Sequence, residues 1–459
     1  MRVEWELAAA ETNGVTALAL PERNSAPCLD QLVQAAPARE LVAGNDIRDQ
    51  RGILLWSAGQ GVNADLRERL ITRRLMQPLE TSLMFRNTLR IGEVIDIAKQ
   101  LLVDHPALDA LLEPRQSQVI YMLGQARIVS GPGMLLTVMA ENRPEALKHA
   151  VMVAMISTWL AVRLDRNDAM VRSAAEAGLM HDIGEIYLPA EVTEPTGRLS
   201  FALWRSLCVH PLVACALLRE SKIYGEATAV AVREHHERVD GSGYPSGASD
   251  LSPLGRILLS AEVLATLMSG GTQAFARVDI ALRMIPGQFP REVIDVVLER
   301  LRTMPEAEAQ PVDTAYVGSA MADLLERLEG ARSQAKALLE TPELSALQVD
   351  LAQRLETQLS RYTSAIHESG APEISSRPDW LTAAPEIAEE VGRIIREMSW
   401  QLPGLHRHAE LMVNARATDR ALWQPLLDAM DIRVRIPDRA ATAAVQLPEA
   451  DAAPACDPM

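Results

Sequence analysis

The sequence is poor in aromatic residues, and its cations are too few to balance its acids. Only four Phe and six Tyr occur in 459 residues, so the 48% of hydrophobic residues is mostly aliphatic, as is typical of helical proteins. The formal net charge of -16 argues against a general nucleic-acid or anionic-membrane surface, because both need clustered cations. We therefore expect a mainly α fold that meets any phosphate at a local site.

Long apolar runs, export signals and paired cysteines are also missing. The longest apolar stretch, residues 150–162, is interrupted by Ser157 and Thr158 and is about five residues too short for a bilayer, which predicts a core helix. Residues 1–6 lack the basic and apolar regions of a secretory signal. The cysteines show no CxxC spacing: Cys28, Cys208, Cys215 and Cys456. We expect idle thiols in a cytoplasmic protein that is not bound to a membrane.

Apolar spacing and composition divide the chain into five segments. They are a small mixed α/β N-terminal module (1–85), a helical connector (86–133), a main helical domain (134–303), a helical C-terminal region (304–436) and an Ala- and Pro-rich tail expected to be disordered (437–459). The C-terminal region opens with a linker at 304–311 and ends in a short strand at 431–436. A helix is expected over 384–400.

Helix signals in the main domain predict five helices. They cover 142–164 with Asn142 as N-cap, 168–183 ending at Gly184, 201–220 kinked at Pro211, 226–237, and one that begins at Ser252. Further on, leucines recur at helical spacing over 344–366 and predict a long amphipathic helix. It pairs either with a helix at 315–340 in a hairpin, the preferred interpretation, or with a second copy in a homodimer.

Histidine is concentrated in the main domain, where five of the nine lie between positions 149 and 236. Imidazoles together with carboxylates suit first-row divalent metals, and the lack of cysteine ligands disfavours structural zinc. His181 and Asp182 are adjacent, so on a helix they diverge by about 100°. A carboxylate that bridges two ions while its neighbour binds one of them resolves this geometry. Such a centre favours metal-assisted hydrolysis of phosphate esters.

Two motifs within residues 140–275 resemble those of the HD-GYP family, a branch of the HD phosphohydrolase superfamily that hydrolyses cyclic di-GMP. They are His181-Asp182-Ile183-Gly184-Glu185 and His235-His236-Glu237-Arg238-Val239-Asp240-Gly241-Ser242-Gly243-Tyr244-Pro245. The resemblance implies an HD-type helical bundle and two or three divalent ions, iron or manganese. It places metal ligands at His149, His181, Asp182, His210, His235, His236 and Glu262, and catalytic positions at Asp182 and Glu185. Glu145 is either a further ligand or part of a capping box.

The chain departs from the family pattern in three places. Glu185 stands where the family has a lysine that faces the substrate phosphate, and this charge reversal should weaken phosphate binding by about 1 kcal/mol or more unless Glu185 turns away or meets a metal. Glu262 stands where the family has aspartate, so the ligand is one methylene longer. The basic stretch that usually follows is replaced by residues 270–277, which contain one cation.

Several assignments stay open at this point. The loop residues Gly243, Tyr244 and Pro245 form either a rigid turn or a surface that lines the site or contacts a signalling partner. Arg256 either lines the site or pairs with Glu262 or another acid. His406 and His408 are interpreted as surface residues.

Two functions follow from the resemblance. The first is a metal-dependent phosphodiesterase acting on a cyclic dinucleotide, which the retained ligand positions favour. The second is a catalytically degenerate signalling module, which the loss of the lysine and of the downstream cations favours. Neither involves a nucleic-acid polymer.

Overall fold

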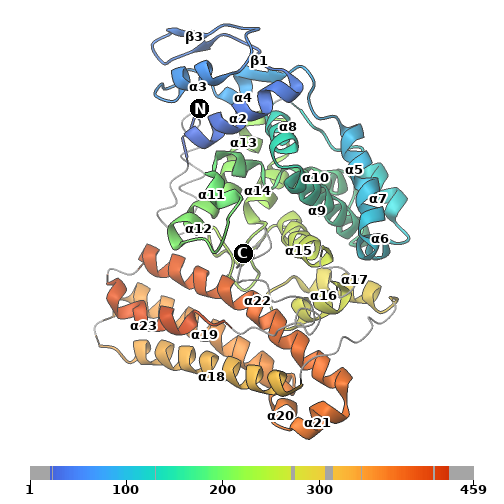
Figure 1. Ribbon diagram of the computed structural model, residues 1–459, viewed down its shortest axis with the longest axis vertical. Coiled ribbons are helices and arrows are strands. Elements are labelled where there is room, and N and C mark those ends of the chain that lie inside the picture. The colour runs from blue at the N-terminus through green and yellow to red at the C-terminus, as the bar shows by residue number, and fades with distance from the viewer. Residues whose placement is uncertain are drawn as a thin grey trace, which may run out of the picture. The chain divides into compact units, whose positions relative to one another are not determined.

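The computed structural model describes residues 21–22, 24–129, 131–269, 274–304, 314–342, 344–416 and 419–433. Within them the chain is mostly helical, which confirms the mainly α fold predicted from the scarcity of aromatic residues (Figure 1). The described residues form two compact units. The first runs to Glu237 and includes Asp250–Ser269, and the second contains Arg238–Ser249 and the residues from 274 onward. The division into five segments stays a prediction.

The first unit begins with a small mixed module, as expected. Its elements are α2 (Ala26–Arg39), β1 (Leu41–Ala43), β2 (Ile47–Arg48), β3 (Leu54–Trp56), α3 (Ala64–Leu70), α4 (Leu79–Ser82) and β4 (Leu83–Phe85). β1 pairs antiparallel with β4, and β2 with β3. The Asn63 side chain accepts a hydrogen bond from the Leu66 amide and so caps α3. Four helices follow: α5 (Ile91–Asp104), α6 (Pro106–Leu112), α7 (Gln116–Leu123) and α8 (Pro132–Asn142).

Two helices form the centre of this unit, α9 (Pro144–Arg163) and α10 (Asp168–Met180). Their backbones approach closely at Gly178, where a Cβ atom would lie only 2.4 Å from Cα of Ala154. The apolar stretch predicted to be a core helix is indeed buried in α9. Two segments, Pro144–Arg163 and Phe201–Ser221, have the length and apolar character of a membrane span, but 72% and 67% of their tested windows are buried inside the chain.

The remaining elements of the first unit carry His210 and lie next to His181, His235 and His236. They are the 3-10 helix η1 (Ile183–Tyr187), α11 (Ala190–Thr193), α12 (Phe201–Leu207), α13 (His210–Ser221), α14 (Glu226–Glu234) and α15 (Pro253–Met268). The predicted cap of the last helix is confirmed, because Ser252 Oγ accepts from the Gly255 amide. Helix α14 ends at Glu234, so His235 and His236 follow it.

Four predicted helix boundaries are wrong, one of them the end of the helix 226–237, which stops at Glu234. Asn142 ends α8 and donates to Gln31, and Arg143 precedes α9 in a non-helical conformation, as the residue before a proline commonly does. The second helix stops at Met180, before Gly184. The third is two helices rather than one kinked helix. Pro211 lies in the first turn of α13, where its missing N–H costs no hydrogen bond.

The second unit is helical beyond the loop 238–249. It contains α16 (Ala274–Arg283), α17 (Arg291–Leu301), α18 (Thr314–Leu339), α19 (Ala346–Glu368), α20 (Ala371–Ser375), α21 (Pro378–Ala383), α22 (Pro385–Arg416) and α23 (Arg420–Met430). α18 packs on α19, which confirms the intrachain hairpin. The apolar face of α19 is buried through Leu351, Leu355 and Leu359, although Leu347 is exposed. The homodimer stays a prediction and would need another surface.

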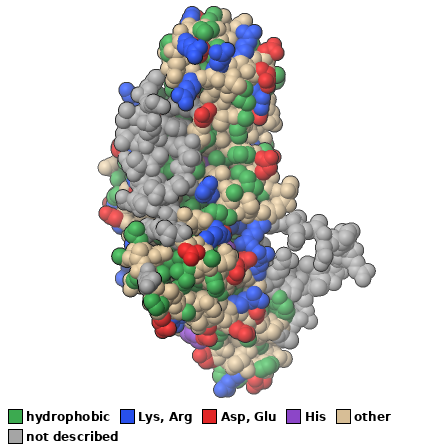
Figure 2. Space-filling model, turned by 90° about the vertical axis from the view of Figure 1, so that its left-hand side faces the viewer, with side chains coloured by type: hydrophobic (Ala, Val, Ile, Leu, Met, Phe, Trp, Pro, Cys, Tyr) green, Lys and Arg blue, Asp and Glu red, His purple; other side chains and the backbone are tan. Residues whose placement is uncertain are grey.

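The predictions for the helix at 384–400, for the linker and tail, and for the strand at 431–436 have different outcomes. The helix predicted over 384–400 continues to Arg416, and His406 and His408 are buried on it, so the prediction of surface residues is wrong. Residues 305–311 of the predicted linker and the tail 437–459 lie outside the described residues. The predicted strand 431–436 is described only to Arg433, where no strand forms. On the face drawn in Figure 2, Lys and Arg side chains are interspersed with acidic and apolar ones.

Candidate metal centre

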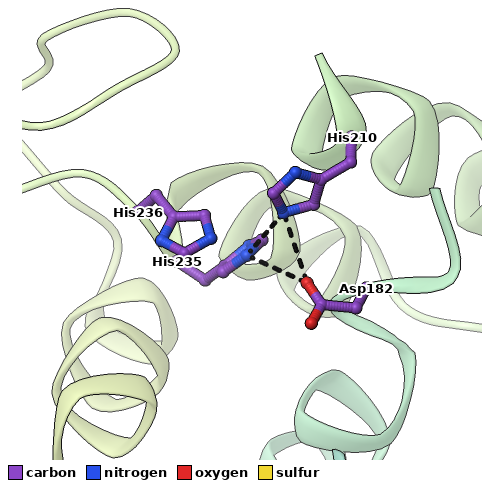
Figure 3. A group of neighbouring side chains, drawn as sticks. All are labelled: Asp182, His210, His235 and His236. Atoms are coloured by element: carbon purple, nitrogen blue, oxygen red, sulfur yellow. Dashed lines mark hydrogen bonds and ion pairs between the residues drawn. The ribbon is translucent and has the colours of Figure 1, made fainter. Parts of the chain in front are cut away.

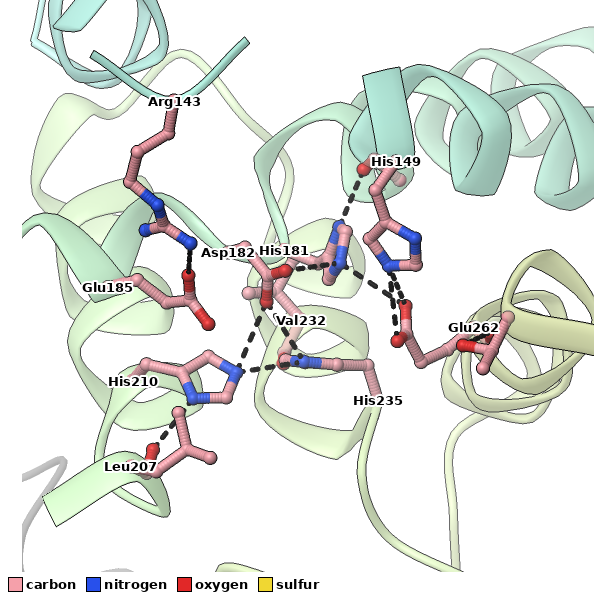
Figure 4. Close-up of polar contacts among 12 residues, drawn as sticks. Arg143, His149, His181, Asp182, Glu185, Leu207, His210, Val232, His235 and Glu262 are labelled. Atoms are coloured by element: carbon pink, nitrogen blue, oxygen red, sulfur yellow. Dashed lines mark hydrogen bonds and ion pairs between the residues drawn. The ribbon is translucent and has the colours of Figure 1, made fainter. Parts of the chain in front are cut away.

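Seven side chains from five parts of the first unit converge on one buried region (Figures 3 and 4). Their positions are His149 on α9, His181 and Asp182 directly after α10, His210 at the start of α13, His235 and His236 directly after α14, and Glu262 on α15. Most of these residues lie at helix ends, where a side chain can project out of the helix packing toward a shared centre. The histidine cluster expected from sequence is therefore assembled by the fold.

Backbone carbonyls fix the orientation of three of the imidazoles. In each, Nδ1 donates to the carbonyl oxygen three residues earlier: His181 to Gly178 at 2.8 Å, His210 to Leu207 at 2.7 Å and His235 to Val232 at 2.6 Å. A carbonyl oxygen only accepts, so Nδ1 must carry the proton in the neutral ring. Nε2 then presents a lone pair to the cluster. Histidines that bind metals are oriented in the same way.

The first group of candidate ligands comprises Asp182, His210, His235 and His236 (Figure 3). Asp182 Oδ1 lies 3.2 Å from His210 Nε2 and 3.6 Å from His235 Nε2, and these two nitrogens are 3.1 Å apart. One ligand atom from each of the four residues lies within 4.8 Å of the others. Several lone pairs thus point into a small volume, an arrangement that suits a cation.

The second group comprises His149, His181 and Asp182, again within 4.8 Å of one another. Asp182 Oδ2 lies 2.9 Å from His181 Nε2. Glu262 Oε2 lies 3.3 Å from the same nitrogen and 3.1 Å from His149 Nε2. The two oxygens of Asp182 therefore face different groups, which is the geometry expected of a carboxylate that bridges two ions.

The charges of the cluster favour metal binding. Burial raises the carboxyl pKa values of Asp182 and Glu262, but the neighbouring histidines lower them well below the usual range, so both carboxylates are ionised. Burial lowers the pKa of His235 to about 4 and that of His236 well below its ordinary value, so both rings are neutral at pH 7. Two carboxylates and several neutral imidazoles form a donor set that fits first-row divalent ions.

The other three histidines are affected in the opposite direction. Burial alone would lower their pKa values, but nearby carboxylates outweigh it. Glu262 raises the pKa of His149, Asp182 and Glu262 raise that of His181 well above its ordinary value, and Asp182 raises that of His210. A metal ion must displace protons from these rings.

Glu145, Arg256 and Glu185 are further predicted site residues that lie outside the two groups. The Glu145 side chain is 81% exposed and binds Lys148 at 2.7 Å, so the structure does not bring it into the cluster. Arg256 is half-buried on α15, while the Glu262 carboxylate contacts His149 and His181. Glu185 is nearly buried and accepts a hydrogen bond from Arg143 at 2.6 Å.

Arg143 was not predicted from the sequence as a residue near the site. It lies 42 positions before Glu185, and its only local mark is its place directly before Pro144 at the start of α9. No periodicity or spacing connects two residues that meet only through the packing of α8 on η1.

The loop after His236 belongs to the second unit and is buried there. Gly243 and Pro245 are buried and Tyr244 is only 6% exposed. Asp240 accepts from Ser242 and, at 3.4 Å, from Arg361 on α19. A Cβ atom on Gly247 would lie 3.5 Å from Cε1 of His408 on α22. The loop is thus held by helices of the C-terminal region.

Comparison with known proteins identifies the segment that carries the cluster. Residues 134–288 match the family model of the HD domain, so this part of the chain is an HD domain and the predicted HD-type helical core is confirmed.

Curated relatives share this segment. The chain is 30% identical over 166 residues to cyclic di-GMP phosphodiesterase PA4108 of Pseudomonas aeruginosa, covering 36% of each chain. It is 28% identical to 3'3'-cGAMP-specific phosphodiesterase 1 of Vibrio cholerae, over 38% of this chain and 42% of the relative. It is also 34% identical to cyclic di-GMP phosphodiesterase response regulator RpfG of Xanthomonas campestris, over 25% of this chain and 31% of the relative. The chain thus spans less than half the length of each.

Proposed function

We propose that this protein is a metal-dependent phosphodiesterase that hydrolyses a cyclic dinucleotide. One observation carries the proposal: the two oxygens of Asp182 face two different groups of histidines, 2.9 Å from His181 Nε2 and 3.2 Å from His210 Nε2. A scaffold without chemistry has no need for a carboxylate shared in this way, because removing charged groups from water is costly and Asp182 is only 15% exposed.

The two groups would hold one divalent ion each, with Asp182 between them. The first ion would be held by His210, His235 and His236, and the second by His149, His181 and Glu262. Two such ions supply a hydroxide nucleophile at neutral pH and neutralise charge on the phosphate. Mixed imidazole and carboxylate ligands suit iron or manganese, which we propose as the metals. A third ion at Glu145 has less support, because that side chain is exposed.

The protein contributes orientation, charge and exclusion of water. Carbonyl bonds to Nδ1 hold His181, His210 and His235 with Nε2 toward the centre. Asp182 and Glu262 together carry two negative charges, whereas two divalent ions would carry four positive charges. The loaded site would therefore have a net positive charge and attract a phosphate diester. His181, His210 and His235 are almost completely buried, which keeps the local dielectric constant low and strengthens these interactions.

The substrate class rests on the relatives. Two of the three named above are called cyclic di-GMP phosphodiesterases and one is called a 3'3'-cGAMP-specific phosphodiesterase. We propose that the substrate belongs to this class and that hydrolysis yields a linear dinucleotide. Action in the cytoplasm fits the thiols of Cys28, Cys208 and Cys215, which are buried.

A non-catalytic signalling module has less support. It would act through the loop around Tyr244, but that side chain is 6% exposed and the loop contacts α19 and α22 of the same chain. A partner protein would have to displace these helices first.

Metal analysis combined with an assay tests the proposal. Protein prepared without oxygen and loaded with iron or manganese should bind about two ions per chain and convert cyclic di-GMP or 3'3'-cGAMP to a linear product. The double variant His181→Ala/Asp182→Ala should lose both properties, whereas Glu145→Gln, which changes an exposed carboxylate nearby, should keep both. Metal-loaded protein that turns over neither nucleotide would contradict the proposal.

A further inference from the structure

A second charged pair lies beside the candidate metal centre. Arg143 Nη2 donates to Glu185 Oε2 at 2.6 Å, and the two side chains are only 11% and 13% exposed. Figure 4 shows both directed toward the side of the centre formed by Asp182 and His210. The pair is shielded from solvent, so its charges are screened less than those of a surface pair.

The packing of η1 fixes the position of Glu185. Gly184, the residue before it, lies so close to the start of α13 that a Cβ atom there would be 2.2 Å from the carbonyl oxygen of His210. The backbone at Glu185 is therefore pressed against the helix that carries His210. After burial and Asp182, the Glu185 charge is a further cause of the altered pKa of His210, which places its carboxylate within electrostatic range of the cluster.

A carboxylate at this place would repel a phosphate, and Arg143 offsets that repulsion. Two unit charges about 4 Å apart interact by about 4 kcal/mol near a protein surface, enough to decide whether an anion binds. Guanidinium groups bind both carboxylate and phosphate oxygens through the same planar set of donors. The Arg143 group bound to Glu185 is thus chemically suited to exchange that carboxylate for a phosphate.

We propose, on the basis of the proposed metal site, that Arg143 is the residue that contacts a substrate phosphate, and that Glu185 positions Arg143 and competes with the phosphate for it. The pair determines specificity through this competition. An anion must displace a carboxylate to reach the guanidinium, so Glu185 reduces the affinity of the site for every phosphate. When Glu185 is neutralised, the affinity for a dianionic phosphate should increase more than the affinity for a monoanionic diester.

Titration with inorganic phosphate tests the proposal without requiring turnover. With manganese-loaded protein, Arg143→Gln should weaken phosphate binding about tenfold or more, and Arg143→Lys should restore most of the loss because it keeps the charge. Glu185→Gln should tighten binding several-fold. The double variant Arg143→Gln/Glu185→Gln should bind more weakly than Glu185→Gln alone, because it lacks the guanidinium that contacts the phosphate. Glu145→Gln is the matched control and should bind phosphate as the unaltered protein does.

Manganese content is measured for every variant and should stay constant. An unchanged phosphate affinity in Arg143→Gln overturns the proposal. So does a loss of manganese in Glu185→Gln without tighter phosphate binding, because Glu185 would then act on the metal. Failure of the proposed function gives a different result: the unaltered protein binds manganese and phosphate but hydrolyses no cyclic dinucleotide. In the enzyme assay, Arg143→Gln should mainly raise KM, whereas a general structural defect would lower kcat and manganese content together.

Discussion

Both carboxylate oxygens of Glu262 lie close to Nε2 of His149, at 3.2 and 3.1 Å, although the two residues are 113 positions apart. Glu262 occupies a position where the resemblance to HD-GYP proteins leads one to expect aspartate. The side chain is 4% exposed and also approaches His181. The longer carboxylate therefore reaches the cluster.

Shortening this side chain should weaken the second group of ligands. Glu262→Asp withdraws the carboxylate by about one carbon–carbon bond, so manganese affinity should fall about tenfold or more, as when a metal site loses an orienting contact. Glu262→Gln keeps the length of the side chain but removes its charge, so manganese affinity should fall further in this variant. Calorimetric titration with manganese measures both, and Glu145→Asp is the control. If Glu262→Asp bound manganese as tightly as the unaltered protein, Glu262 would not be a ligand.

Metal affinity should depend on pH, because carboxylates raise the pKa of His149, His181 and His210 despite burial. A raised pKa keeps a larger fraction of each ring protonated in the metal-free protein, and a protonated ring cannot ligate. Manganese affinity should therefore increase from about pH 6 to about pH 8, with protons released on binding. Titrations in two buffers of different ionisation enthalpy count these protons. An affinity that is constant over this range would contradict the assignment of these rings as ligands.

The close packing at Gly184 predicts a strong effect of one methyl group. In Gly184→Ala the added Cβ would meet the carbonyl oxygen of His210 at 2.2 Å and the amide nitrogen of Ala214 at 3.1 Å, both on backbone that cannot rotate away. We expect a loss of about 3 kcal/mol in the free energy of unfolding and a lower metal content, because His210 must move. Gly197→Ala is the matched control, since nothing lies within 4 Å of its Cβ position. Equal stability of the two variants would show that η1 packs differently.

Glu397 on α22 should make the second unit less stable at neutral and higher pH than at about pH 4.5. Its side chain is 3% exposed, and burial raises its pKa from 4.5 to about 7, while Gln401 donates to it at 2.8 Å. Above about pH 4.5 the unfolded chain loses this proton and the folded chain keeps it. The contribution of Glu397 to the free energy of unfolding is therefore fully present below about pH 4.5. It is lost as the pH rises through about 7, by about 3 kcal/mol in total.

Replacing Glu397 removes this loss. Glu397→Gln should raise the melting temperature at about pH 8 and leave it nearly unchanged at about pH 5. Glu390→Gln, an exposed glutamate on the same helix, should show neither effect. An equal shift of Glu397→Gln at both pH values would mean that burial does not control the titration of this carboxyl.

The sequence predicted those features that leave a mark close to one another in the chain. Adjacent His181 and Asp182 implied a carboxylate shared between two groups of ligands, and its two oxygens do face different histidines. Ser252 before Pro253 marked the start of α15 correctly. The pairing of α18 with α19 followed from leucines at helical spacing.

What the sequence did not predict depends on tertiary packing. Arg143 meets Glu185 only because α8, which Arg143 directly follows, packs on η1, and no local pattern encodes that contact. His406 and His408 were interpreted as surface residues because they lie outside the histidine-rich part of the sequence, yet the fold buries that part of α22. Pro211 was assigned to a helix interior because apolar spacing continues across the break between α12 and α13.

The course of the chain at Glu237 limits how the protein can be divided. Immediately after His236 and Glu237 the chain enters the second compact unit at Arg238 and returns to the first only at Asp250. A fragment that ends before residue 304 would keep all seven candidate ligands, but its loop would lose Arg361 and His408 as packing partners. The HD domain and the C-terminal helices are therefore not interchangeable modules. A domain exchange or fusion that separates them would expose the buried Tyr244 loop, so such chimeras should keep residues 238–433 together.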